Sequence, residues 1–92
     1  MKYKVIMTNK FSKDLKQLDK RGYDLEKIKN VILKLANGNK LPDKYKDHSL
    51  KGFYEGKREC HILPDWLIIY EIDSDILILY LIRNGTRSDL FG

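Results

Sequence analysis

The two histidines of this chain, His48 and His61, are its best candidates for acid–base chemistry, because an unperturbed imidazole titrates close to neutral pH. They lie on either side of a basic stretch punctuated by glycines, and Asp65 follows His61 closely. Metal-free cleavage of RNA needs a group that takes a proton from the 2′-hydroxyl and one that gives a proton to the leaving 5′-oxygen. We expect His48, His61 and Asp65 to share these proton transfers.

Arginines and aromatic residues supply the other groups that such a reaction needs. Residues 61–92 contain Arg83 and Arg87 as isolated cations in an otherwise acidic and apolar region. A planar guanidinium grips a phosphate through several donors, so we expect these two arginines to hold it as its charge grows. Unpaired bases stack on aromatic rings. We accordingly expect Tyr54 and Trp66 to stack on RNA bases. The RNA backbone is expected to contact Lys51, Lys57 and Arg58. Phe91 is counted among the catalytic residues.

Each of these residues also has a purely structural interpretation. His48 can simply cap a loop, and His61 can be a surface residue of a strand. Asp65 can simply complete a turn after Pro64, and Trp66 is more often a core residue than a stacking surface. Phe91 can anchor the end of the chain against a sheet.

Metal and nucleophilic chemistry fit the sequence less well. A zinc site requires three or four ligands at characteristic spacings, and His48, His61 and Cys60 do not provide them. Cys60 alternates with His61 along a predicted strand, so its thiol points to the other face and inward. No glycine-rich phosphate loop is present. We therefore expect neither a metal nor another cofactor.

Composition favours one small basic domain formed by residues 1–92. The chain carries a net charge of +5, and all of its 18 Lys and Arg residues except Arg83 and Arg87 lie in residues 1–60. This distribution favours a polyanionic or acidic partner, although a solubilising lysine surface is the simpler explanation. No apolar run is long enough to span a membrane and no signal peptide is evident, so we expect a cytoplasmic protein with no membrane partner.

The apolar pattern predicts the elements that position these residues. Residues 2–7 alternate as a first strand, and Thr8 or Asn9 caps a helix that Gly22 ends. Asp24 caps a second helix that ends before Gly38. The two amphipathic helices form a hairpin that must cover a sheet. Residues 37–47 are a loop.

Three strands follow, over residues 57–63, 66–72 and 76–82, with turns at Pro64-Asp65 and at residues 73–75. The order is β-α-α-β-β-β with a short tail over residues 83–92. This pattern predicts an α+β fold in which the helical hairpin packs on a mainly antiparallel, twisted sheet. The residue composition of 66–72 indicates a strand that is covered on both faces.

Four segments together resemble the YafQ toxins, which belong to the RelE/ParE superfamily of toxin–antitoxin systems. They are Tyr45-Lys46-Asp47-His48-Ser49-Leu50-Lys51-Gly52, Gly56-Lys57-Arg58-Glu59-Cys60-His61-Ile62, Pro64-Asp65-Trp66-Leu67-Ile68-Ile69-Tyr70 and Gly85-Thr86-Arg87-Ser88-Asp89-Leu90-Phe91-Gly92. The likeness spans nearly the whole chain, since length and element order also match.

The resemblance implies a toxin that cuts messenger RNA in the ribosomal A site through attack of the 2′-hydroxyl, without a metal. The family's functional positions fall on His48, His61, Asp65, Trp66, Arg83, Arg87 and Phe91. The first three would activate the nucleophile and stabilise charge, Arg83 would hold the phosphate, and Phe91 would orient the base. It also implies an acidic, partly disordered antitoxin that forms a hetero-oligomer with a toxin that is monomeric when free.

One position departs from the family pattern, because Arg87 stands where YafQ toxins commonly have the histidine taken as general acid. A guanidinium stabilises charge but is a poor proton donor. Either His48 or His61 then acts as the general acid, or the leaving oxygen takes its proton from water or the ribosome. A third possibility is that catalysis is weakened. Two alternatives remain. One is a gyrase-poisoning toxin, as in ParE-like members of the same superfamily, and the other, suggested by Arg87, is a catalytically weakened module that binds an antitoxin.

Overall fold

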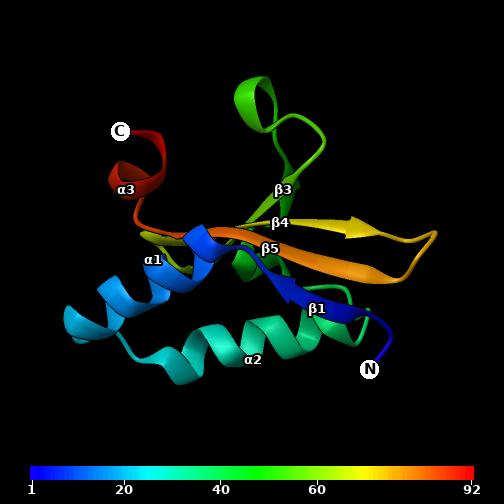
Figure 1. Cartoon of the computed structure of the whole chain (residues 1–92), viewed down its shortest axis with the longest axis horizontal. Helices are drawn as coiled ribbons and strands as arrows, with labels where there is room; N and C mark the ends of the chain where they lie inside the picture. The colour runs from blue at the N-terminus through cyan, green and yellow to red at the C-terminus, as the bar shows by residue number, and fades with distance from the viewer.

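Two helices lie against one face of a five-stranded sheet in the computed structural model, which describes all 92 residues (Figure 1). The sheet has the order β1-β5-β4-β3-β2, with β1 parallel to β5 and the other neighbours antiparallel. The predicted α+β fold is confirmed. The elements are β1 (Lys4–Met7), α1 (Asn9–Lys20), α2 (Leu25–Ala36), η1 (Asp43–Tyr45), β2 (His48–Ser49), η2 (Gly52–Tyr54), β3 (Arg58–Leu63), β4 (Trp66–Asp73), β5 (Ile78–Gly85) and α3 (Arg87–Phe91).

Thr8 starts the helical hairpin. Its hydroxyl accepts a hydrogen bond from the Phe11 backbone N–H at 3.0 Å and donates one to the Ile82 carbonyl at 2.6 Å. The same side chain therefore caps α1 and fastens it to β5. Gly22 follows α1 with a φ of +86°, a conformation that glycine adopts without strain. Asp24 caps α2 by accepting from the Glu26 N–H at 3.1 Å.

The core lies between this hairpin and the sheet. Its buried side chains include Phe11, Leu18, Ile28, Val31, Leu35, Cys60, Ile68, Leu79 and Leu81. The opposite face of β4 is also covered, because Leu67 and Ile69 pack with Leu90 of α3. The prediction of a strand covered on both faces is confirmed for residues 66–70, whereas Glu71 and Ile72 are only partly buried. Burial also raises the pKa of the Cys60 thiol to about 12, which agrees with its expected inward position.

A β-bulge in β5 sets the direction of the side chains that precede α3. Ile69 pairs with Arg83 and Tyr70 pairs with Leu81, so Ile82 is an extra residue on β5. Asn84 therefore faces the core, where its amide N–H donates to the Phe11 carbonyl at 3.3 Å and its oxygen accepts from the Trp66 indole at 3.3 Å. Arg83 is left on the other face.

Several predicted boundaries were wrong. The first strand is shorter than residues 2–7, and the last hairpin turn extends through Leu77, which has a φ of +55°. The last strand therefore begins at Ile78 rather than Ile76, and it reaches Gly85. The edge strand β2 was not predicted, and residues 87–91 of the expected tail form α3. No helix has the length and apolarity needed to cross a membrane.

Candidate active site

Glu59 is the centre of a cluster of ionisable side chains on the face of the sheet opposite α1 and α2. Its carboxylate is 1% exposed and lies on β3 beside His48 of β2, its partner in the strand register. Glu59 Oε2 is 3.0 Å from His48 Nε2, 3.3 Å from Arg87 Nη2 and 3.8 Å from His61 Nε2. These four side chains are called the Glu59 cluster below.

The second carboxylate oxygen of Glu59 is unusual. Oε1 is buried and has no hydrogen-bond partner in the protein. Buried polar atoms are nearly always satisfied, and a buried carboxylate costs free energy unless cations and donors compensate it. Oε2 has that compensation from its neighbouring cation and imidazoles, whereas Oε1 has none.

The ring orientations of the two histidines are fixed by backbone carbonyls. His48 Nδ1 lies 2.6 Å from the Lys46 carbonyl and His61 Nδ1 lies 3.2 Å from the Pro64 carbonyl. Because a carbonyl only accepts, each Nδ1 carries the proton and each Nε2 is directed toward Glu59. The short contact from His48 Nε2 to Glu59 therefore requires one further proton between them. His61 Nε2 is beyond hydrogen-bond distance of that carboxylate and keeps a free lone pair.

Arg87 reaches the cluster from α3. Thr86 caps this helix in a reciprocal capping box with Asp89, and the Arg87 backbone N–H donates to Asp65 Oδ1 at 3.2 Å. The guanidinium carbon of Arg87 also lies 5.2 Å from the centroid of the Phe91 ring. Asp65 thus lies where its carboxylate holds the first turn of α3. Its hydrogen bond is to this backbone, and none is formed with either histidine.

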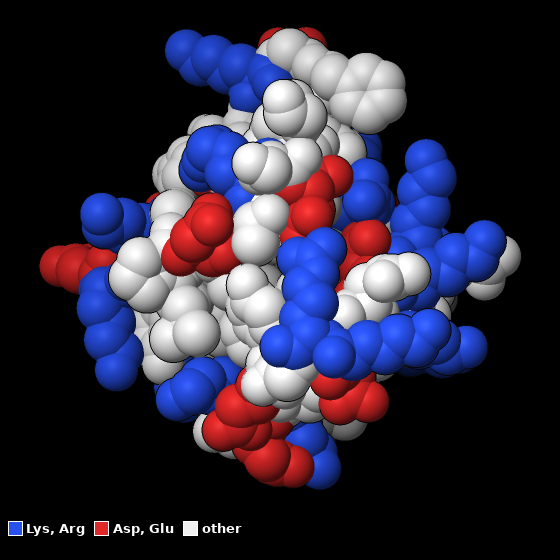
Figure 2. All heavy atoms as spheres, turned by 90° about the vertical axis from the view of Figure 1, so that its left-hand side faces the viewer, with Lys and Arg blue, Asp and Glu red and all other residues white.

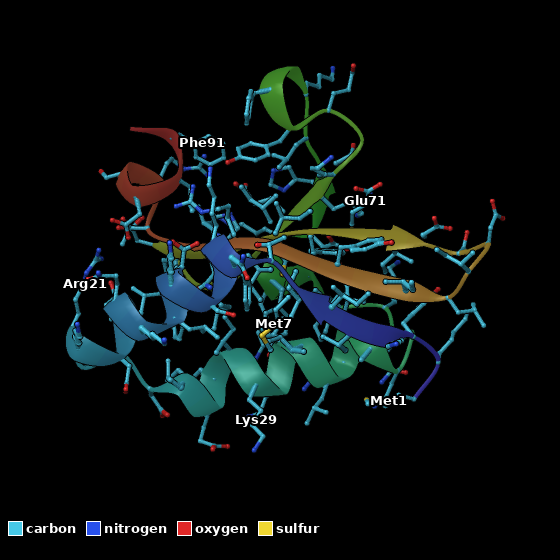
Figure 3. The ribbon with its side chains drawn as sticks, in the orientation of Figure 1. Met1, Met7, Arg21, Lys29, Glu71 and Phe91 are labelled. Carbon is cyan, nitrogen blue, oxygen red and sulfur yellow. The ribbon has the colours of Figure 1, made fainter.

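A second contact fixes α3 from the side of α1. Arg21 donates two hydrogen bonds to Asp89, Nη1 to Oδ2 and Nη2 to Oδ1, both at 3.0 Å. This pairing lowers the pKa of Asp89 to about 2. Figure 3 shows Arg21 at the end of α1 below α3, and Phe91 on the side of α3 that faces η2.

Arg83 lies outside the Glu59 cluster. Its Nε and Nη2 donate to Asp14 of α1 at 2.8 and 3.1 Å, in a half-buried bidentate pair. The hydrogen bonds to Asp14 raise the pKa of Arg83. Arg83 also lines a hollow with Tyr54, so a phosphate bound there would meet a guanidinium whose orientation is already set.

The exposed aromatic residues of the site lie between η2 and α3. Tyr54 meets Phe91 edge to face, with ring centroids 5.8 Å apart, and Phe91 is 45% exposed. Leu90 rather than Phe91 anchors α3 against the sheet. Lys51 lines the hollow beside Phe91, and Lys57 lines the hollow beside Arg83 while pairing with Glu71 at 3.4 Å.

Two residues expected to bind RNA are located elsewhere. Trp66 is 0% exposed, and its indole packs edge to face on Tyr23 with centroids 5.1 Å apart. It offers no free face for a base, so this prediction is corrected. Arg58 lies on the opposite face of β3 from Glu59, where its Nε donates to Asp47 at 3.2 Å. Its cation pairs with the loop before β2, and its contact with RNA stays a prediction.

Sequence reasoning missed Glu59. The signal that could have found it is its alternation with Cys60 and Ile62 in a strand, which places it on the face of His61. A carboxylate that is buried on this face of the strand requires a partner. The side chains offer no group of three or more His, Cys, Asp or Glu residues that could hold a metal ion.

Comparisons with known proteins agree with this fold over nearly all of the chain. The family model for YafQ, a bacterial toxin of type II toxin–antitoxin systems, matches residues 3–92. The chain is 40% identical over 86 residues to the mRNA interferase toxin YafQ of Escherichia coli strain K12, covering 92% of this chain and 91% of the relative. The crystal structure of YafQ from E. coli strain BL21(DE3) has a TM-score of 0.92 at 37% identity, covering 98% of this chain and 99% of that chain. YafQ in the E. coli DinJ–YafQ complex has a TM-score of 0.89 at 37% identity, with the same coverage.

Proposed function

The chain belongs to the YafQ family of bacterial toxins of type II toxin–antitoxin systems, and we propose that it is an mRNA interferase whose active site is the Glu59 cluster. The observation that carries this proposal is the contact of one buried carboxylate with His48, His61 and Arg87. Like other groups placed for proton transfer, these side chains converge from different elements on one point. Cleavage takes place on the ribosome, which supplies the extended message.

His61 is the general base in this proposal. Its Nδ1 hydrogen bond to Pro64 leaves the Nε2 lone pair free to take the proton of the 2′-hydroxyl. The resulting 2′-oxygen attacks the adjacent phosphorus, and the bond from phosphorus to the 5′-oxygen breaks. The products are a 2′,3′-cyclic phosphate and a 5′-hydroxyl.

His48 and Arg87 act on the side of the leaving group. The proton shared between His48 Nε2 and Glu59 is available to the departing 5′-oxygen, and Arg87 stabilises the negative charge that develops on the phosphate. With these two roles divided between His48 and Arg87, the reaction needs no histidine at position 87. Arg87 takes the electrostatic part of the acid's role, and His48 takes the proton transfer.

The surrounding residues position the substrate. Arg83 binds the scissile phosphate, Phe91 and Tyr54 contact bases, and Lys51 and Lys57 contact the flanking backbone. Asp65 acts through α3, since its carboxylate holds the backbone that carries Arg87. It is therefore a positioning residue in this scheme.

An antitoxin partner follows from the family and the charge. E. coli YafQ forms a complex with DinJ, and we propose that this chain is held by a cognate antitoxin with an acidic, partly disordered segment. Lys and Arg side chains are spread widely over the side of the molecule shown in Figure 2, with acidic groups between them. With a net charge of +5, the same surface would attract ribosomal RNA in the cytoplasm once the toxin is free.

The test uses purified ribosomes, a defined message and the purified protein. Wild type should yield fragments with 2′,3′-cyclic phosphate or 3′-phosphate ends and 5′-hydroxyl ends. His61→Ala should abolish cleavage while circular dichroism shows that the protein folds. Leu33→Ala, on the exposed side of α2, is the matched control and should cut normally.

Two results would contradict the proposal. Breaks in DNA in the presence of gyrase, with intact message, would indicate the activity of ParE toxins. Intact message and DNA, together with tight antitoxin binding, would indicate a module that has lost catalysis.

A further inference from the structure

Phe53 is the most exposed large apolar side chain of the protein, with 93% of its surface accessible. It lies in η2 and meets Tyr54 edge to face, with ring centroids 4.9 Å apart and an interplanar angle of 86°. Tyr54 in turn meets Phe91 of α3. The three rings therefore form a row that begins at the active site and ends in solvent at Phe53.

Two hollows lie on either side of the Phe53–Tyr54 pair. The first, about 350 Å³, is lined among others by Phe53, Tyr54, Ile82, Lys10, Lys57 and Arg83. The second, about 320 Å³, is lined by Lys51, Phe53, Tyr54, Leu90 and Phe91. Both volumes fall at the lower end of the range of ligand pockets, roughly 300–1,000 Å³.

The linings of the two hollows share the chemistry that binds single-stranded nucleic acid. Each combines aromatic walls with at least one lysine, and neither is lined by a carboxylate. Lys57 is paired with Glu71 at 3.4 Å and Arg83 is paired with Asp14, so Lys10 and Lys51 are the lining cations without such a partner. Aromatic rings with neighbouring cations suit stacked bases and their phosphates.

We propose that the Phe53–Tyr54 pair is a wall between two nucleotide-binding hollows, and that Phe53 stacks on a message base next to the cleavage point. This inference rests on the proposed function, because Arg83 lines the first hollow and Phe91 lines the second. A nucleotide whose phosphate meets Arg83 has its base beside Phe53 and Tyr54. The following base lies across the wall, beside Phe91.

The occupant is an unpaired strand of RNA. A duplex buries its base faces in its own stack, so it has none to offer to the ring of Phe53. An acidic antitoxin segment would use Lys10 and Lys51 but would have no need of a flat aromatic face. The stacking ring is therefore the feature that separates the two occupants.

The first experiment measures message cleavage on ribosomes for Phe53→Ala, Phe53→Leu and Phe53→Trp. Loss of one stacked base should raise KM about 5- to 150-fold in Phe53→Ala and Phe53→Leu, with kcat less affected. Phe53→Trp should keep a KM near that of wild type, since it retains a flat ring. Leu33→Ala, which removes another exposed apolar side chain from α2, should change neither constant.

The second experiment uses Phe53→Trp as a fluorescent probe, combined with His61→Ala to prevent cleavage. Trp66 is buried and contributes a constant signal, so a change reports the indole at position 53. A single-stranded oligoadenylate hexamer should quench this emission, and a duplex of equal length should not. The quenching should weaken as salt rises.

The outcomes distinguish this inference from the proposed function. A normal KM for Phe53→Ala, with an inactive His61→Ala, would overturn the stacking wall and leave the active site standing. A fully active His61→Ala would overturn the active site itself. Loss of antitoxin binding by Phe53→Ala with unchanged cleavage would assign the exposed ring to the antitoxin, and this too would overturn the inference.

Discussion

Arg87 Nη2 lies 3.3 Å from Glu59 Oε2, so the C-terminal helix brings a positive charge onto a carboxylate that is buried in the sheet. The same oxygen is 3.0 Å from His48 Nε2. The Glu59 cluster therefore contains residues of β2 and β3 together with Arg87 from α3. The geometry makes α3 part of the proposed active site rather than a tail.

Glu59→Gln should reduce message cleavage by about 10²- to 10⁴-fold, the usual contribution of a group that acts in proton transfer. The amide keeps the shape of the side chain but cannot hold the proton that His48 shares with the carboxylate. Single-turnover cleavage on ribosomes measures the effect. Glu55→Gln, an exposed glutamate in the adjacent loop, is the matched control and should behave as wild type. Equal activity of both variants would remove Glu59 from the mechanism.

Arg87→His should change the pH dependence of cleavage rather than simply lower the rate. An imidazole at this position offers a second proton donor to the leaving oxygen, whereas the guanidinium offers only charge. We expect the variant to depend less on His48, so that His48→Ala costs it less than it costs wild type. Rates from pH 5 to 9 for the four proteins measure this coupling. Identical losses in the two backgrounds would mean that Arg87 and His48 act independently.

Arg83→Ala should lower both the activity and the stability of the protein. Removing the guanidinium leaves Asp14 half-buried without its partner, which costs about 1–3 kcal/mol. Asp14→Asn separates the two roles, because it weakens the pair and leaves the cation for the phosphate. Urea unfolding and cleavage should show reduced stability with retained activity for Asp14→Asn. An inactive but folded Asp14→Asn would show that the orientation set by Asp14 is essential.

Trp66→Phe should retain a normal KM for message, since the indole is buried against Tyr23 and contacts no solvent. Trp66→Ala should lose about 3–5 kcal/mol of stability because it leaves a cavity in the core. Thermal unfolding separates the two effects. A folded Trp66→Phe variant with a strongly raised KM would restore the residue to the RNA surface.

The contact of Arg21 with Asp89 should make α3 sensitive to acid. The pKa of Asp89 is about 2 in the folded protein against 3.8 for an ordinary aspartate, so the charged form is favoured by folding. This stabilisation is fully present above about pH 4 and is lost as the pH falls toward 2. The protection of the α3 amides against hydrogen exchange, taken relative to the unstructured chain at the same pH, should be lower at pH 3 than at pH 6. In Asp89→Asn the α3 amides should already be less protected at pH 6, and their protection should differ less between pH 3 and pH 6 than in wild type.

The sequence predicted most of the fold because its local signals agree with the structure. Thr8 and Asp24 cap their helices as expected, and Pro64-Asp65 forms the expected turn. The predictions failed where long-range contacts decide the outcome. His48 becomes a strand residue only because Glu59 lies beside it, and the bulge at Ile82 depends on β4.

The candidate site was predicted in its residue types more than in its arrangement. The two histidines and Arg87 come together, but the carboxylate between them is Glu59 rather than Asp65. Spacing along the chain does not reveal that a buried glutamate will meet three side chains from other elements. Trp66 is likewise buried and so cannot contact RNA. The sequence could not reveal this, since a flat aromatic ring is equally suited to a core and to a stacking surface.

The parallel pairing of β1 with β5 has a consequence for how the toxin folds as it is synthesised. Lys4 lies beside Ile78, so the sheet gains its edge strand only after nearly all of its sequence has been synthesised. Contacts this distant along the chain form slowly. Arg87 follows β5, and it reaches Glu59 later still. A ribosome that makes this protein therefore carries a chain whose histidines are already present but whose proposed active site has yet to assemble, so we expect activity only once folding is nearly complete.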